Sequence, residues 1–130
     1  MPVFYTETYP AKAMKLNPHL MCVFVESHEH RGGDPATVQI RESDRSLPLT
    51  LRNNFSDNGY LVSDTEVRDI TKIENEVQMI MYKLRMGVTI CLPTLRLNDE
   101  LNNLEKHTPK VEQYLLKRLN IMKQGYPLLG

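Results

Sequence analysis

The sequence predicts an α/β fold, in which a small, mostly parallel or mixed sheet of about four strands carries helices on both faces. Two near-continuous apolar runs, at 20–27 and 88–93, are typical of strands that are covered on both sides. Between them, residues 67–84 carry apolar side chains at spacings of three and four, the pattern of an amphipathic helix. Because strands and helices alternate along the chain, we expect parallel strands joined by helical crossovers.

Two strands and a connector are predicted at the start of the chain. Residues 3–8 alternate β-branched or aromatic side chains with polar ones and are closed by Tyr9-Pro10, which indicates a first strand. Residues 11–19 are expected to be a connector. The run at 20–27 then predicts the central strand of the sheet.

A short helix and another strand follow. Asp34 can cap free helix amides and Pro35 suits the first helical position, so we predict a helix over 35–43. Residues 47–53 resemble a strand, and Pro48 within it favours an edge position or a strand start.

The long helix has start and stop signals of its own. Ser63 and Glu66 match a capping box, which predicts the helix start. Gly87 suits a left-handed residue after the last turn, so the helix is expected to end there. The apolar run 88–93 then predicts a buried strand.

Two further helices are predicted near the end of the chain. Asn98 is a candidate cap for a short helix over 98–106, and Thr108-Pro109 indicates the start of a last one. The apolar stripe of that last helix consists of Val111, Leu115, Leu119 and Met122.

Length and charge limit the class of protein. The 130 residues predict a single domain over 1–130, with a core at 1–124 and a tail at 125–130. Sixteen basic and sixteen acidic residues cancel, so a nucleic-acid partner is not expected. The longest apolar runs are of strand length, far below the roughly 20 residues of a membrane span, so no membrane association is expected either.

The cysteines and the start of the chain favour a cytoplasmic protein. Cys22 and Cys91 lie inside apolar strand-like runs, so they are expected to be buried thiols. They could touch each other if their strands are neighbours. The first residues lack the basic and then apolar pattern of a secretory signal.

The stretch His28-Glu29-His30 raises the question of a metal site. Two imidazoles two residues apart face one side only in an extended chain, and Asp34, Asp57 or Asp64 would have to complete the site. A polar loop beyond a strand is the simpler interpretation, so we predict no metal and no cofactor.

Catalytic motifs are not apparent. The sequence has no G-x-S-x-G motif, its cysteines lie in strands, and acidic pairs such as Glu74 with Glu76 fall on expected polar faces. An enzyme is therefore less favoured than a binding protein, and no catalytic residue is assigned.

The joint Arg31-Gly32-Gly33-Asp34 is the best candidate site. In a parallel sheet, ligands gather outside the carboxyl ends of the strands, where a glycine turn lets backbone N–H groups approach a phosphate. Arg31 could add a charged fork, and Arg41 follows about two helical turns later. Asp34 opposes this interpretation, because its carboxylate would repel an anion and occupy the same amides.

Three stretches together carry a resemblance: "LMCVFVESHEHRGGDPATVQIRES", "SLPLTLRNNFSD" and "VTICLPTLRLNDELNNLEKHTPKVEQYLLKRL". They are similar to a small family of uncharacterised bacterial and phage α/β domains. That family reads "VFGDN", "R-x-G-x-GGQA-x-IR", "GIPTK", a strand ending "LP", a glycine-rich "GLGTGLA" and a terminal "P-x-(I/V)" helix. The resemblance spans residues 20–119.

The resemblance implies a nucleotide or ADP-ribose-type pocket, with a logic like that of macro-like and other Rossmannoid domains. Gly32 and Gly33 match its first glycine turn, and Arg31 and Arg41 match its arginines. The second turn departs from the pattern, because residues 93–101 contain no glycine. Side chains there, such as Thr94 and Arg96, would have to contact the ligand instead.

Three functions remain open. The first is a small phage-type accessory protein that binds or sequesters a nucleotide-like or ADP-ribose-like ligand, in a counter-defence role in the host cytoplasm. The second is a protein-interaction module that inhibits a host enzyme through a surface. The third is a hydrolase of ADP-ribose derivatives with Asp34 or Asp57 as base. The stripe at 67–84 could pack on the sheet or form a homodimer seam.

Overall fold

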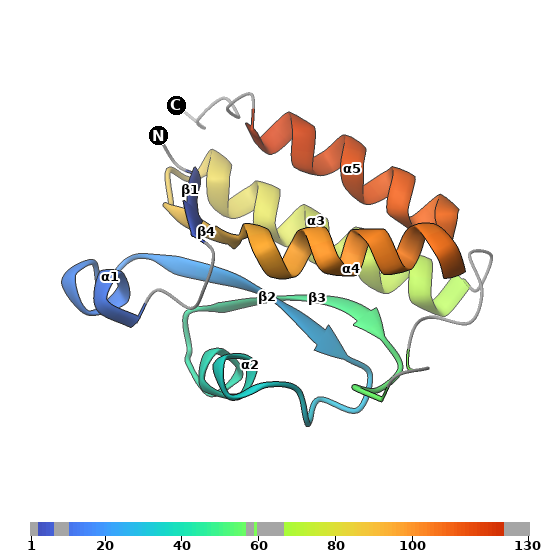
Figure 1. Ribbon diagram of the computed structural model, residues 1–130. Coiled ribbons are helices and arrows are strands. Elements are labelled where there is room, and N and C mark those ends of the chain that lie inside the picture. The colour runs from blue at the N-terminus through green and yellow to red at the C-terminus, as the bar shows by residue number, and fades with distance from the viewer. Residues whose placement is uncertain (1–2, 7–10, 57–58, 60–66, 124–130) are drawn as a thin grey trace.

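The computed structural model describes residues 3–6, 11–56, 59 and 67–123, in which strands and helices alternate (Figure 1). The strands are β1 (Val3–Thr6), β2 (Met21–Ser27), β3 (Ser46–Arg52) and β4 (Ile90–Pro93). The helices are α1 (Ala11–Leu16), α2 (Pro35–Arg41), α3 (Val67–Arg85), α4 (Thr94–His107) and α5 (Pro109–Lys123).

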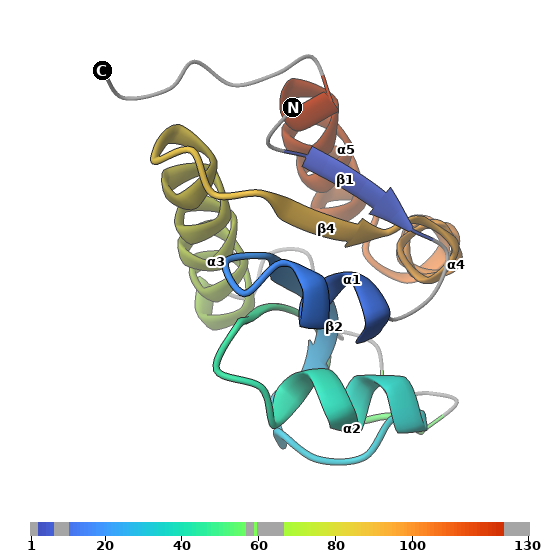
Figure 2. The same cartoon turned by 90° about the vertical axis from the view of Figure 1, so that its left-hand side faces the viewer.

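The strands form one sheet in the order β1-β4-β2-β3, and every pair is parallel. The predicted class, a small and mostly parallel sheet of about four strands with helices on both faces, is confirmed. Figure 2 shows β1 running beside β4, with α4 starting where β4 ends. Among the described residues, no helix has the length and apolar character needed to cross a membrane.

Alternating side chains of the strands build two apolar layers. Val23 and Val25 of β2 point into the larger core, which is covered by α3, α4 and α5. Cys22 and Phe24 point the other way, into a smaller cluster with Met14 of α1 and Ile40 of α2. Figure 1 shows α2 on one side of β2 and β3, and α3, α4 and α5 on the other.

The register places the two cysteines side by side. Cys22 of β2 pairs with Cys91 of β4, and both are fully buried. The hydrogen bond to Cys91 and burial together raise the pKa of the Cys22 thiol. The prediction of buried thiols is therefore confirmed, and the two cysteines are also neighbours, which the sequence left open.

Several predicted boundaries are confirmed by specific contacts. The Thr37 backbone N–H donates to the Asp34 carboxylate at 2.8 Å, which caps α2 as predicted. Gly87 has a φ of 85°, the left-handed conformation expected after α3. The predicted capping box at Ser63 and Glu66 lies outside the described residues, as does the tail at 125–130.

Two helix predictions were wrong. Residues 11–19 were expected to be a connector, but they contain α1, whose Met14 is buried against Leu20. The second error concerns 93–101, because α4 starts at Thr94 and Asn98 is an exposed residue inside it instead of its cap. The buried stripe of Leu97, Leu101 and Leu104 explains this longer helix, since its helical spacing continues upstream of the predicted start.

Candidate functional site

The carboxyl edge of the sheet contains a topological switch point. β2 and β4 are neighbours, but β2 leads into α2 on one face and β4 leads into α4 on the other. The connections therefore diverge at this edge, which is where parallel sheets bind ligands. The predicted glycine turn follows β2 and the start of α4 follows β4, so both lie at this edge.

The glycine turn adopts a conformation that requires glycine. Gly32 and Gly33 have φ values of 80° and 92°. A Cβ on Gly33 would lie 3.0 Å from Thr37 and 3.5 Å from Phe55, and one on Gly32 would lie 3.6 Å from Phe55. The side-chain faces of both glycines are thus packed. Their backbone N–H groups make no hydrogen bond to any described residue.

Arg41 is held at this turn by a buried carboxylate. Its Nε and Nη2 donate to the two oxygens of Glu26, each at 2.6 Å, and Nη2 also donates to the Gly32 carbonyl at 3.0 Å. Glu26 is 2% exposed, and its hydrogen bonds raise the pKa of Arg41, so the guanidinium stays charged. Nη1 has no partner in the described part of the chain.

Arg31 lies beside the same turn, but its side chain is much more exposed than that of Arg41. Its side chain is 81% exposed and its Nε donates to Glu29 at 3.0 Å. Four of the predicted ligand residues are therefore together: Arg31, Gly32, Gly33 and Arg41. The other two, Thr94 and Arg96, begin α4 at the same edge, but their side chains lie outside what the structure describes.

Asp34 and Asp57 were the two candidate catalytic bases. The Asp34 carboxylate is engaged in capping α2, where it accepts the Thr37 N–H. That bond favours a structural role over the role of a catalytic base. Asp57, the other suggested base, lies outside the described residues.

His28 was expected to be a solvated loop residue, but it takes part in a partly buried pair. Its Nε2 lies 2.7 Å from Oδ1 of Asp69, in the first turn of α3. The His28 side chain is 18% exposed and that of Asp69 is 0% exposed. This contact ties the end of β2 to the start of α3. No metal-binding group of three or more His, Cys, Asp or Glu occurs among the described residues.

A further ion pair lies at the same edge. Arg52, at the end of β3, donates to Glu100 of α4 through Nε at 3.1 Å and Nη2 at 3.0 Å. Arg52 also lies over the Phe55 ring, with its guanidinium carbon 5.8 Å from the ring centre. Phe55 in turn packs against Gly32 and Gly33, so Arg52 is linked to the glycine turn through this ring.

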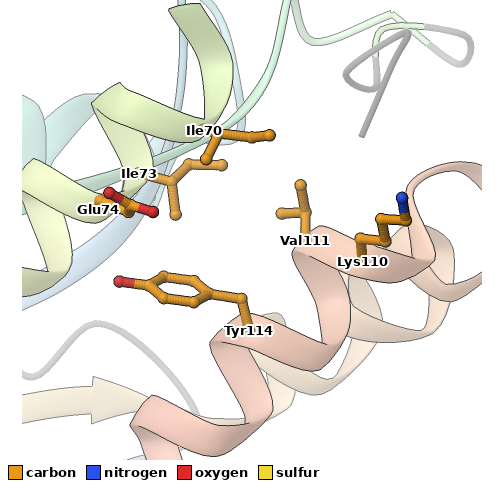
Figure 3. A pocket seen from close by; sticks show the side chains of 6 residues that line it. All are labelled: Ile70, Ile73, Glu74, Lys110, Val111 and Tyr114. Carbon is orange, nitrogen blue, oxygen red and sulfur yellow. The ribbon is translucent and has the colours of Figure 1, made fainter. Parts of the chain in front are cut away.

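A separate hollow of about 200 Å³ lies between α3 and α5. Figure 3 shows Ile70 and Ile73 of α3 directed toward Val111 of α5, with Glu74, Lys110 and Tyr114 around them. Its lining is mainly apolar and comes from two helices on one face of the sheet. It offers no cluster of donors for an anion.

Sequence reasoning missed most of the charged network at the edge. Glu26 could have been noticed, because a charged residue at the end of an otherwise apolar strand requires a buried partner. The partners of the other pairs, Asp69 and Glu100, are 41 and 48 positions away in sequence. No local pattern relates such distant residues.

The fold and this edge define a small α/β domain with a parallel sheet and charged pairs at its carboxyl edge. Comparison with known protein families identifies the family of this chain. It belongs to DUF7831, a family of unknown function whose match spans residues 4–118. No curated protein and no solved structure matches it. The expectation of a small uncharacterised family is thus confirmed, while the motif pattern and the macro-like relation remain predictions.

Proposed function

We propose that this protein binds a phosphate-bearing, nucleotide-like ligand at the carboxyl edge of its sheet. The observation that carries the proposal is the fixed Arg41 guanidinium beside two exposed glycine amides. Glu26 and the Gly32 carbonyl hold this guanidinium, and Nη1 has no partner among the described residues. A preorganised arginine loses little conformational entropy when it binds a phosphate.

The donors around the turn suit a phosphate group. The N–H groups of Gly32 and Gly33, the Nη1 of Arg41 and the terminal nitrogens of Arg31 can all donate, and none has a partner among the described residues. Charged and backbone donors are the usual recognition elements for phosphate oxygens. Glu29 and Asp34 offset part of the positive charge, so we expect binding to depend on hydrogen-bond geometry more than on net charge.

A ligand panel tests the proposal. Thermal unfolding is recorded with ADP-ribose, ADP, ATP, NAD and inorganic phosphate, and a ligand at about one hundred times its dissociation constant should add about 2.7 kcal/mol of stability. Arg31→Ala should abolish most of the shift without disturbing the fold, because Arg31 is 81% exposed. Lys117→Ala, an exposed cation on α5, is the matched control and should keep the shift.

The possible results of the ligand panel distinguish binding at this site from binding elsewhere. A shift with a nucleotide that is lost in Arg31→Ala and kept in Lys117→Ala supports the proposal. Absence of a shift with every ligand, for a folded sample, rejects it. A shift that is equal in both variants places the ligand elsewhere and also rejects this site.

A protein-interaction module remains the second candidate. The exposed apolar residues Met79 and Tyr82 on α3 favour it, since a surface without a small-molecule pocket could still inhibit an enzyme. The phage-type counter-defence role and the ADP-ribose hydrolase activity rest on the family resemblance alone. Retention of a specific host partner by both wild type and the Arg31→Ala variant would favour the interaction module.

A further inference from the structure

The α3 helix carries a second apolar stripe on the face that points away from the core. Met79, Tyr82 and Met86 are 51%, 52% and 56% exposed. With exposed Asn75 they recur at spacings of four, three and four, which is the a/d pattern of a coiled-coil seam. Met86 extends this pattern past the last residue of α3, because its N–H still donates to the Tyr82 carbonyl at 3.0 Å.

This stripe is distinct from the one that builds the core. Ile73, Val77, Ile80 and Leu84 are at most 1% exposed and pack against the sheet, so the internal packing of α3 is complete without the outer stripe. An isolated exposed apolar residue needs no explanation, but a half-exposed stripe at seam spacing marks a contact surface.

The geometry points to a second copy of this chain as the occupant, with the two α3 helices packed antiparallel about a two-fold axis. The residues one position after each seam residue determine whether the two α3 helices pack antiparallel or parallel. Glu76 follows Asn75 and Lys83 follows Tyr82, so both lie on the same flank of α3. In an antiparallel pair like flanks meet, so Lys83 of each copy approaches Glu76 of the other, whose carboxylate also accepts the Thr50 N–H and hydroxyl of its own chain.

A parallel pair lacks this complementarity. There, the flank with Glu76 and Lys83 would face the opposite flank, which carries Thr71 and Gln78 at the corresponding positions. No acid would meet a base. The antiparallel arrangement also sets Met86 of one copy opposite Asn75 of the other, next to a groove of about 320 Å³. That groove is bordered by Asn75, Met79 and Pro48, and it can accept the flexible methionine side chain.

The neighbouring sheet edge offers no competing mode of contact. β3 is the outer strand, and its outward Thr50 N–H donates to the Glu76 carboxylate at 2.7 Å. Pro48, two residues earlier and on the same side, has no N–H to donate. Strand-to-strand pairing of two copies through β3 is therefore disfavoured, whereas the outer face of α3 stays exposed.

The seam is short, so the dimer should be weak. From Asn75 to Met86 the helix rises about 17 Å, which gives an interface at or below about 1,200 Å². Sedimentation equilibrium across the micromolar range should show the average mass rising from one chain to two. Tyr82→Glu should raise the dimer dissociation constant about tenfold or more, because it places a charge at the centre of the seam.

Controls separate the seam from other surfaces. Leu116 on α5 is 39% exposed, so Leu116→Glu makes a matched apolar-to-acid change elsewhere and should leave dimerisation unchanged. Lys83→Glu should weaken the dimer and Lys117→Glu should not, with the difference shrinking as salt is added. Circular dichroism confirms that each variant is folded.

Each outcome either supports or overturns the proposed dimer. Wild type that stays monomeric throughout the range overturns the inference. A dimer that survives Tyr82→Glu, or one lost in Leu116→Glu instead, assigns association to another surface and overturns it as well. A dimer weakened by Tyr82→Glu but not by Lys83→Glu supports the surface and rejects the antiparallel orientation.

Discussion

Glu26 and Arg41 form a two-point ion pair, at 2.6 Å for each contact, at the end of the central strand. Glu26 is 2% exposed and Arg41 18% exposed, so the carboxylate depends on this partner. The pair connects the packing of α2 to the proposed ligand site, because the same guanidinium donates to Gly32.

Removal of Arg41 should destabilise the fold strongly. Arg41→Ala leaves a buried carboxylate without its partner, and we expect a loss of about 3 kcal/mol in the free energy of unfolding. Urea denaturation monitored by circular dichroism measures it. Arg31→Ala, at a solvent-exposed pair, should change stability by less than about 0.5 kcal/mol. A loss below about 1 kcal/mol for Arg41→Ala would show that Glu26 is satisfied without it.

The two glycines should differ in their tolerance of alanine. Both have positive φ, so each alanine costs about 1–2 kcal/mol from the backbone alone. Gly33→Ala adds a Cβ at 3.0 Å from the Thr37 side chain, whereas Gly32→Ala meets only ordinary contact with Phe55 at 3.6 Å. Thermal unfolding of both variants should therefore rank Gly33→Ala as the less stable. Equal stabilities would contradict the packing of Gly33 against Thr37.

Glu76 should make stability depend on pH. Burial raises its pKa, although two hydrogen bonds from Thr50 oppose the shift. Since its pKa is higher in the folded than in the unfolded state, its contribution is fully present below the unfolded pKa and is lost as pH rises through the folded one.

The variant Glu76→Gln tests that dependence. Its amide oxygen can still accept the Thr50 N–H, and its NH₂ group can donate to the Thr50 hydroxyl. Urea unfolding from acid to neutral pH should therefore show the variant gaining stability relative to wild type as pH rises. A constant difference between the two proteins would mean that Glu76 titrates alike in both states.

The two cysteines should be unreactive while the protein is folded. Cys22 and Cys91 are fully buried, and the raised pKa of Cys22 keeps its thiolate rare. Ellman's reagent should titrate both thiols in urea and neither under native conditions. Fast reaction of the native protein would indicate that β2 and β4 open readily around this pair of cysteines.

The helices and strands could be predicted from the sequence because their patterns are local. Apolar spacing identified α3 and α5, and Asp34 and Gly87 signalled a helix start and end. Residues 11–19 were missed because a helix as short as α1 shows little periodicity. The start of α4 was missed because Asn98 is a favourable cap residue, although the leucine stripe already begins at Leu97.

The candidate site was partly readable for the same reason. The glycine turn and its two arginines are neighbours along the chain or along one short helix, so the sequence placed them together. The ion-pair partners of the arginines could not be predicted from the sequence. Glu26 is 15 positions from Arg41, and Glu100 is 48 positions from Arg52. Such pairs meet only when the sheet orders its strands.

The sequence by itself determined the α/β class, the central strand, the long helix and the position of the glycine turn, because propensity, periodicity and capping act over a few residues. Only the tertiary structure decided the strand order, the ion pairs at the carboxyl edge and the exposure of the second stripe on α3. These features depend on contacts between distant segments, whose energies come from burial and charge pairing that no local pattern contains.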